Sequence, residues 1–356
     1  DYRLVNDEIG LKDAISELKG KIAERNTLLA VDCEGESLSR KGALTIITEA
    51  TEEKVYIFDV LKLGQHVFSF GLGDILEDKS REKLTFDCRQ DSDALLHQFK
   101  VKLSGVLDLQ LLEVIYRREN PTADSTVNTP KSSTNKRYSR RSQRTDEIEK
   151  IYGFGRCIHL YVQDEKLTKI KDKGQELVKK DKKVWTKRPL SDDLIQYCIV
   201  DTMAMFPLYN KIKEVNDGEQ GMALLRVASE KYVDMYREKT ERSFAEYETN
   251  AYLPLDIFPD KGTLDFPASS TECTCCHRRF PREEFSKTQL RHGEQKCRVC
   301  KEIKRREDVA QNRADNWHRA AQEEDDCIYI PEGMSDYAFI WGHEPWEERD
   351  DDSYYY

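Results

Sequence analysis

The stretch LLAVDCEGES, residues 28–37, joins a strand-like apolar run to two acids separated by one residue. Successive side chains of a strand point to opposite faces, so Asp32 and Glu34 are expected on one face and Cys33 on the other. Two ionised carboxylates this close repel each other, and a bound cation relieves the repulsion. The alternative is a pair of solvated acids on the rim of a sheet, because Asp-x-Glu alone is weakly specific.

The composition indicates a globular protein with polar extensions. The chain has 356 residues, of which 38% are hydrophobic and 35% charged, and its net charge is −10. That length can hold one large domain and something smaller, and the negative balance argues against a protein that coats nucleic acid uniformly. No apolar run approaches the roughly 18 residues of a membrane span, and no signal-peptide pattern opens the sequence. We therefore expect an intracellular protein of the nucleus or cytoplasm, with no membrane partner.

The apolar runs around the opening motif predict an α/β fold. Three consecutive strand-like runs, LLAVDCE, ALTIITEA and KVYIFDV, are followed by alternating helices and strands. This order predicts a mixed five-stranded sheet flanked by helices. No Gly-x-Gly-x-x-Gly follows the first strand, so a doubly wound dinucleotide-binding fold is not expected.

A second acidic motif lies in LTFDCRQDSDALLHQF, where a helix follows directly after a strand. Asp91 opens this helix, four and five residues ahead of Leu95 and Leu96. That spacing favours Asp91 as the acid near the end of the strand, while Asp87 and Asp93 compete for the role.

A third motif lies on the helix DDLIQYCIVDTM, which Ser191 is expected to cap. Tyr197 and Asp201 are four residues apart and therefore share one helical face. This face borders the apolar stripe of the helix, so both side chains are expected to face the sheet.

The segments VDCEG, FDCRQDSDALLHQF and WTKRPLSDDLIQYCIVD resemble the three motifs of the DEDDy 3′–5′ exonucleases. These enzymes form the ribonuclease D-like branch of the ribonuclease H-like superfamily. The sequence of these segments is most similar to the Egalitarian and exonuclease 3′–5′ domain-containing subgroup. The resemblance covers about residues 1–215 and implies a ribonuclease H-like fold.

The resemblance also implies roles for individual residues. Asp32, Glu34, Asp91 and Asp201 match the acids that hold two Mg²⁺ or Mn²⁺ ions, and Tyr197 matches the tyrosine that orients the attacking water. The implied reaction is hydrolysis of single-stranded nucleic acid from its 3′ end to 5′-mononucleotides, with RNA favoured over DNA. Because all five residues are retained, the enzyme is favoured over the rival hypothesis, a catalytically silent RNA-binding adaptor on the same scaffold.

Five of the ten cysteines crowd into residues 273–300. Cys273 and Cys276 form one CxxC pair, and Cys297 and Cys300 form a second pair after twenty intervening residues. This spacing is typical of a structural Cys₄ zinc site, and zinc binding would supply the folding energy of so small a module. Two nearby residues, Cys275 and His277, compete as ligands.

The zinc segment also resembles the LIM-like zinc domain of a fungal RNA-silencing adaptor, which implies a protein partner. Its basic residues equally allow contact with nucleic acid. These residues are Lys287, Arg291, Lys296, Arg298, Lys301, Lys304 and Arg305.

The resemblance, the cysteine spacing and the composition shifts along the chain together predict five segments. These are an exonuclease domain (1–215) with a disordered basic insertion (117–147), a helical extension (216–250), a linker (251–271), a zinc-binding module (272–305), and a charged helix with an acidic aromatic tail (306–356). A tolerated loop is the favoured interpretation of the insertion, ahead of an RNA-binding or phosphorylated segment. The Lys-rich stretch 166–183 is either a solvated helix face or a track for the nucleic-acid backbone. The tail is a candidate for binding a protein partner.

Overall fold

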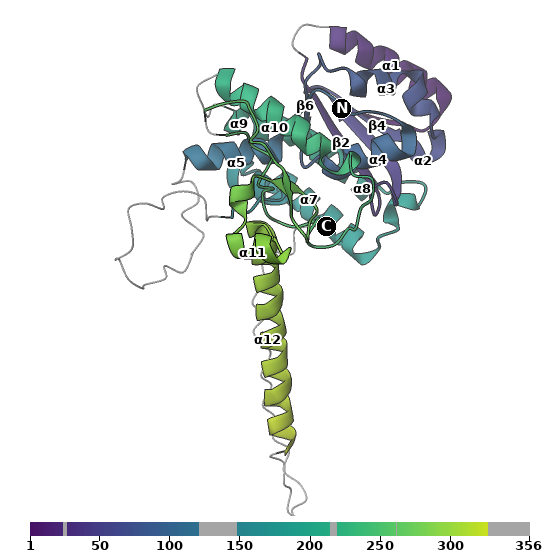
Figure 1. The fold of residues 1–356 in the computed structure, drawn as a ribbon. Coiled ribbons are helices and arrows are strands. Elements are labelled where there is room, and N and C mark those ends of the chain that lie inside the picture. Colours follow the sequence, from purple (N-terminus) through teal and green to yellow (C-terminus); the bar gives the residue numbers. More distant parts are fainter. Residues whose placement is uncertain (24–26, 121–147, 214–218, 261, 327–356) are drawn as a thin grey trace, which may run out of the picture. The chain divides into compact units, whose positions relative to one another are not determined.

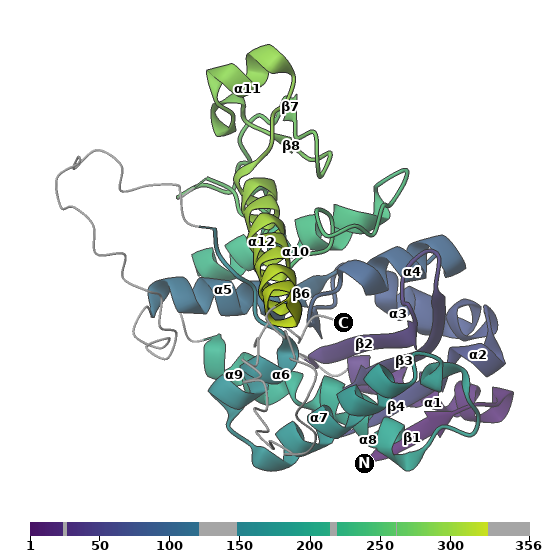
Figure 2. The same ribbon diagram turned by 90° about the horizontal axis from the view of Figure 1, so that it is seen from below.

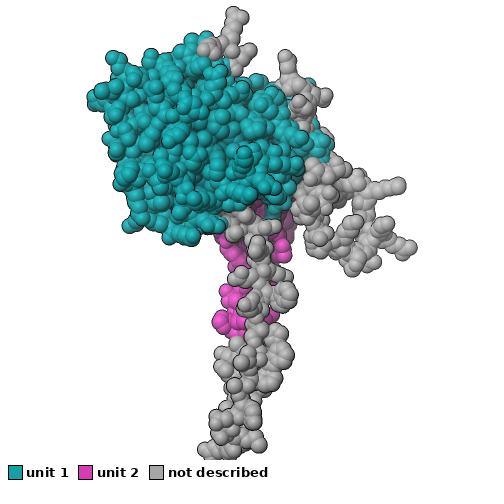
Figure 3. Space-filling model, turned by 180° about the vertical axis from the view of Figure 1, so that it is seen from behind, with its two compact units in different colours: residues 1–145, 149–243, 253–267 teal, residues 146–148, 244–252, 268–356 magenta. Residues whose placement is uncertain are grey.

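The computed structural model describes residues 1–23, 27–120, 148–213, 219–260 and 262–326. They form two compact units, shown in teal and magenta in Figure 3. Unit 1 comprises residues 1–145, 149–243 and 253–267, and unit 2 comprises residues 146–148, 244–252 and 268–356. Most of the predicted insertion and the whole stretch 327–356 lie outside the described residues.

A mixed sheet forms the centre of unit 1. Its strands are β1 (Tyr2–Val5), β2 (Leu29–Glu36), β3 (Ala43–Ala50), β4 (Val55–Asp59), β5 (Lys83–Thr85) and β6 (Val106–Asp108), in the spatial order β1-β4-β3-β2-β5-β6. The pairs β2–β3 and β3–β4 are antiparallel, whereas β1–β4, β2–β5 and β5–β6 are parallel. The sheet thus has six strands where five were expected, because Tyr2–Val5 extends its edge beside β4.

Helices flank this sheet (Figures 1 and 2). The α-helices of unit 1 are α1 (Glu8–Ala23), α2 (Val60–Leu63), α3 (Gly73–Glu77), α4 (Arg89–Phe99), α5 (Leu109–Glu119), α6 (Phe154–Cys157), α7 (Glu165–Lys180), α8 (Asp192–Met203), α9 (Met205–Ile212) and α10 (Glu219–Arg237). Two π-helical segments, η1 (Phe68–Leu72) and η2 (Ile158–Val162), and a 3₁₀ turn, η3 (Val184–Thr186), complete the unit.

Two helices position the acidic motifs against the sheet. Helix α8 packs on β2, β3 and β4, and α10 runs along α4 and β6. The first residues of the predicted insertion are helical, because α5 continues to Glu119. The predicted helical extension (216–250) is divided between the units: α10 belongs to the same compact unit as the sheet, whereas residues 244–250 belong to unit 2.

Unit 2 contains the cysteine-rich segment. A short hairpin of β7 (Thr271–Glu272) and β8 (Arg279–Phe280) precedes η4 (Arg282–Glu284), α11 (Lys287–His292) and α12 (Arg298–Asp326). A capping box between Ser286 and Gln289 starts α11. The small apolar core of the cysteine-rich segment contains Phe280, Phe285, Val299 and Ile303. Across the described parts of both units, every helix is too short or too polar to cross a bilayer.

Candidate active site

The opening motif lies at the end of β2, beside an irregularity in the sheet. The register between β2 and β3 shifts after Glu34, leaving Thr45 as an additional residue of β3. The Thr45 hydroxyl donates to the Glu34 carbonyl at 3.2 Å. A Cβ on Gly35 would lie 1.8 Å from the Ala43 carbonyl oxygen, so only glycine allows the two strands to approach here. Such bulges are common next to functional sites, and this one follows directly after Glu34.

Helix α8 brings the third motif to these two acids. Ser191 caps the helix by accepting the Leu194 N–H at 3.4 Å, as predicted. One turn separates the buried side chains of Tyr197 and Asp201. One carboxylate oxygen of Asp201 lies with one oxygen each of Asp32 and Glu34, all within 4.8 Å of one another. Residues about 170 positions apart in the sequence therefore form one acidic cluster.

Asp91 lies in the first turn of α4, buried and outside this group of three acids. Burial raises the pKa of its carboxyl well above the ordinary value, and the next cause is the charge of Asp32. Asp91 is therefore close enough to Asp32 for their charges to interact. Its competitor Asp87 is paired with the guanidinium of Arg89 at 2.5 and 2.6 Å.

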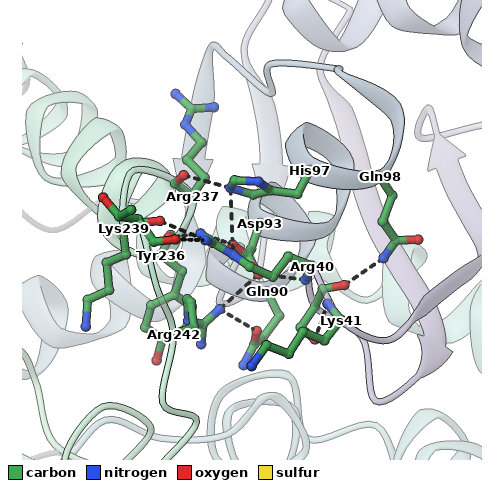
Figure 4. A network of polar contacts seen from close by, with 12 residues as sticks. Arg40, Lys41, Gln90, Asp93, His97, Gln98, Tyr236, Arg237, Lys239 and Arg242 are labelled. Atoms are coloured by element: carbon green, nitrogen blue, oxygen red, sulfur yellow. Dashed lines mark hydrogen bonds and ion pairs between the residues drawn. The ribbon is translucent and has the colours of Figure 1, made fainter.

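The other competitor, Asp93, is fully buried in a polar network (Figure 4). Arg40 donates to it from the backbone N–H at 2.7 Å and from Nε at 2.9 Å. The Arg242 Nη1 donates from 3.1 Å, and the His97 ring lies 3.8 Å away. Two guanidinium groups thus compensate the charge of Asp93, whereas the Asp91 environment adds negative charge.

The electrostatics of the acidic cluster favour a bound cation. Burial and then the Asp201 charge raise the pKa of Asp32 to about 7, and burial with the Asp32 charge raises that of Glu34 well above its ordinary value. The Asp32 Oδ2 atom is buried and has no hydrogen-bond partner among the described residues. Hard oxygen ligands of this kind suit Mg²⁺ or Mn²⁺, so the donor set fits the cation that the motifs imply.

A residue of this site that the sequence did not single out is Lys171, on α7. Its Nζ donates to both carboxylate oxygens of Asp201 at 2.7 Å and to the Tyr197 hydroxyl at 3.2 Å. One turn further along α7, a Cβ on Gly174 would lie 1.9 Å from the Tyr197 ring. Helical spacing could have predicted that Lys171 faces inward, because Lys171 lies four residues after Leu167 and three before Gly174.

The remaining lysines of the Lys-rich stretch behave differently from Lys171. Several are exposed and form surface ion pairs with nearby acids. The pairs are Lys169–Glu165, Lys173–Asp193 and Lys180–Glu176. This pattern is the solvated helix face that the sequence suggested as one alternative.

Asp108, at the end of β6, caps α5 by accepting the Gln110 N–H at 3.0 Å. It also accepts the Cys88 N–H at 2.9 Å and the Thr85 hydroxyl at 3.2 Å. All its contacts are to neighbouring elements of the fold. Asp108 therefore braces the start of α4 and of α5.

In unit 2, the two CxxC pairs converge. The sulfur atoms of Cys273, Cys276, Cys297 and Cys300 all lie within 4.8 Å of one another, and these four side chains are buried. The two competing residues lie outside the group: Cys275 is half-buried, and the exposed His277 places Nδ1 3.0 Å from Glu272. Four thiol groups at this separation can bind a tetrahedral zinc ion.

Comparison with known proteins agrees with this geometry. A family model described as 3′–5′ exonuclease matches residues 2–216. Human piRNA biogenesis protein EXD1 is 28% identical over 217 residues, covering 60% of this chain and 37% of that protein. The Bombyx mori protein of the same name is 38% identical over 87 residues, covering 24% of this chain and 28% of that protein. The chain thus spans about a third of the length of these curated relatives.

Solved structures show the same fold. Trypanosoma brucei RNase D in complex with GMP aligns with a TM-score of 0.54 at 24% identity, covering 71% of this chain and 69% of that one. The same enzyme in complex with RNA U12 aligns with a TM-score of 0.53 at 23% identity, covering 81% and 87%. The predicted ribonuclease D-like fold and the resemblance to the exonuclease 3′–5′ domain-containing subgroup are thereby confirmed.

Proposed function

Because the chain belongs to the 3′–5′ exonuclease family, we propose that it is a metal-dependent enzyme that degrades single-stranded RNA from the 3′ end and releases 5′-mononucleotides. The observation that carries this proposal is the convergence of Asp32, Glu34 and Asp201 beside Tyr197, with Asp91 bordering Asp32. Phosphodiester hydrolysis is a reaction that such a set of acids can support.

The acids are proposed to hold two Mg²⁺ or Mn²⁺ ions, which when bound would supply an activated water and stabilise the leaving 3′ oxygen. Asp32 and Glu34 come from a strand, and Asp91 and Asp201 come from helices, so rigid elements orient all four carboxylates. Burial, and then the charges of neighbouring acids, raise the pKa values of Asp32 and Glu34, and a bound cation would offset both effects.

Tyr197 is proposed to orient the attacking water by hydrogen bonding. Burial, together with the charge of Asp201, raises the pKa of its phenol well above the ordinary value. The hydroxyl therefore stays protonated at neutral pH, which makes it a hydrogen-bonding group rather than a general base.

RNA is proposed as the substrate in preference to DNA. The similar Trypanosoma brucei enzyme is an RNase D seen in complex with RNA U12, and the curated relatives are named for piRNA biogenesis. An intracellular setting, in the nucleus or cytoplasm, fits this substrate. It also fits the nine free thiols of the described residues, because disulfides are rare in reducing compartments.

The test is a time course on 5′-labelled single-stranded RNA and DNA with Mg²⁺ or Mn²⁺. Wild type is expected to shorten RNA from its 3′ end, while Asp201→Asn, which keeps the shape but removes the charge, is expected to lose at least about a hundredfold in rate. Asp193→Asn is the matched control, because this exposed acid lies on the same helix and pairs only with surface Lys173 among the described residues. Equal rates for Asp201→Asn and wild type would contradict the proposal.

A second candidate function is favoured by one observation, the ion pair between Lys171 and Asp201. An ammonium group on a metal-binding carboxylate is compatible with a catalytically silent adaptor that binds RNA on an exonuclease scaffold. In the same experiment, retained RNA binding without shortening in either metal would favour the adaptor.

For unit 2 we propose that Cys273, Cys276, Cys297 and Cys300 hold one structural zinc ion and that residues 272–305 form the zinc-binding module. The module, with the segment that follows it, is proposed to recruit a protein partner or the RNA substrate. Exposed basic side chains such as Lys287, Arg291 and Lys301 support contact with an acidic partner.

A further inference from the structure

The ammonium group of Lys171 lies against the carboxylate that the active site would use to hold a cation. Its Nζ contacts both oxygens of Asp201 at 2.7 Å and the Tyr197 hydroxyl at 3.2 Å. An ammonium group has three N–H donors, and these contacts match them in number. The two side chains of the ion pair are only 7% and 4% exposed, so solvent screens them weakly.

The surroundings of Lys171 hold it in this position. Its Nζ lies 5.1 Å from the centre of the Phe154 ring and 4.6 Å from that of Tyr197, which are favourable distances for a cation over aromatic faces. The backbone of α7 is fixed one turn away, where Gly174 lies directly on the Tyr197 ring. Lys171 is therefore a built-in part of the site rather than a surface lysine of the Lys-rich stretch.

While the Lys171 ammonium group stays on Asp201, it opposes the binding of a metal ion to all three acids of the cluster. A cation held jointly by Asp32, Glu34 and Asp201 needs at least one oxygen of Asp201, yet the ammonium group bonds to both oxygens. Two positive charges beside one buried carboxylate repel each other strongly. Because of this repulsion, we expect Lys171 and a divalent ion to compete for Asp201.

We propose that Lys171 is a positioning residue of this active site: an internal cation that holds Asp201 and Tyr197 in place before metal binds, and that a divalent ion displaces from Asp201. The inference rests on the proposed function, since it takes these acids to be metal ligands. It implies that wild type binds metal more weakly than a chain that lacks this ammonium group.

The test measures Mn²⁺ binding by isothermal titration calorimetry, on the full chain carrying its zinc and without nucleic acid. Lys171→Met keeps the length of the side chain but removes the charge, and it is expected to bind Mn²⁺ about tenfold tighter than wild type, a difference of about 1.4 kcal/mol. Lys171→Arg retains the charge and is expected to stay close to wild type. Lys173→Met, an exposed lysine of the same helix, is the matched control.

A second readout is the melting temperature. Without added Mn²⁺, Lys171→Met is expected to melt below wild type because the acids lose their counter-charge. Saturating Mn²⁺ is expected to remove that difference. Lys171→Gln, which can still donate a hydrogen bond, replaces the methionine variant if the latter does not fold without metal.

The inference would be overturned if the neutral variants bound Mn²⁺ no more tightly than wild type does. This outcome is distinct from failure of the proposed function. If wild type and variants bind Mn²⁺ in the expected order but RNA is never shortened, the competition at Asp201 stands and the adaptor hypothesis gains. If neither wild type nor the neutral variants bind Mn²⁺ at all, the inference is overturned together with the metal site.

Discussion

Gly174 shows how one missing side chain sets the spacing between two helices at the site. The Cβ of an alanine there would lie 1.9 Å from a carbon of the buried Tyr197 ring. We expect Gly174→Ala to lower the free energy of unfolding by about 1–3 kcal/mol, because the ring or α7 must shift. Gly20→Ala, in a helix with nothing within 4 Å of the new Cβ, is the control and is expected to raise stability slightly. Urea unfolding measures both, and equal effects would contradict the steric explanation.

Glu49 is a buried acid of β3 whose two carboxylate oxygens have no hydrogen-bond partner among the described residues. Burial raises the pKa of its carboxyl from 4.5 to about 8, although the charge of Lys83 opposes the shift. Between these two values the folded state holds a proton that the unfolded chain releases. The stabilisation from this group is therefore fully present below about pH 4.5. It is lost as the pH rises to about 8, by up to roughly 5 kcal/mol.

Chemical unfolding measured at intervals between pH 5 and 8 tests this prediction. The unfolding free energy of Glu49→Gln is expected to fall less steeply with pH than that of wild type, because the amide cannot ionise. Glu52→Gln, at an exposed position close by in the sequence, is expected to follow the wild-type curve. Parallel curves for wild type and Glu49→Gln would show that this carboxyl does not carry the pH dependence.

At the scale of elements, the network around Asp93 joins α4 to the segment that follows α10. Arg40 bridges Asp93 to the carbonyl oxygens of Tyr236 and Lys239, at 2.8 and 2.7 Å, and Arg242 reaches the same acid (Figure 4). A buried hydrogen bond also ties α10 to the sheet: the Ser229 hydroxyl accepts the Asp108 N–H at 3.0 Å. These contacts explain why α10 and the sheet belong to one compact unit.

Asp93→Ala is expected to lower the unfolding free energy by about 3–5 kcal/mol, because it leaves two buried guanidinium groups without their carboxylate. Asp193→Ala removes an exposed acid and is expected to cost at most about 1 kcal/mol. Hydrogen exchange in α10 is expected to accelerate in the first variant alone. Unchanged protection of α10 in Asp93→Ala would argue that this network does not hold the extension.

At the scale of the whole molecule, the two units are expected to respond differently to loss of zinc. Unit 1 has a large apolar core, whereas the cysteine segment of unit 2 buries few apolar side chains and depends on its proposed metal. A zinc-selective chelator is expected to make the segment around residues 272–305 sensitive to protease and its thiols reactive. The thermal transition of unit 1 is expected to stay within a few degrees.

Two single substitutions sharpen the zinc experiment. Cys276→Ser removes a member of the sulfur group and is expected to release zinc, while Cys275→Ser lies outside that group and is expected to retain one zinc ion per chain. Metal content after dialysis distinguishes the two variants. Zinc loss from Cys275→Ser at the same level as from Cys276→Ser would contradict the four-sulfur site.

Local pattern was sufficient to predict much of this protein. The alternation of VDCEG, the cap at Ser191 and the i, i+4 pair of Tyr197 and Asp201 depend on residues close in the sequence, and the described elements carry them as expected. The antiparallel start of the sheet was predictable for the same reason, since short connections join consecutive strands. The residues of the three acidic motifs could be predicted because each motif is one continuous stretch of the sequence.

Tertiary structure alone decided which charged side chains compensate which acids. The sequence offers Asp87, Asp91 and Asp93 within seven residues, and it placed Lys171 in a stretch that looked solvated. Asp87 pairs with Arg89, two residues away, but the partners of the others are distant. Arg242 is 149 residues from Asp93, and Lys171 is 30 residues from Asp201. Charges are paired by distance in space, so their partners follow from the packing of α4, α7, α8 and the segment after α10 and not from spacing along the chain.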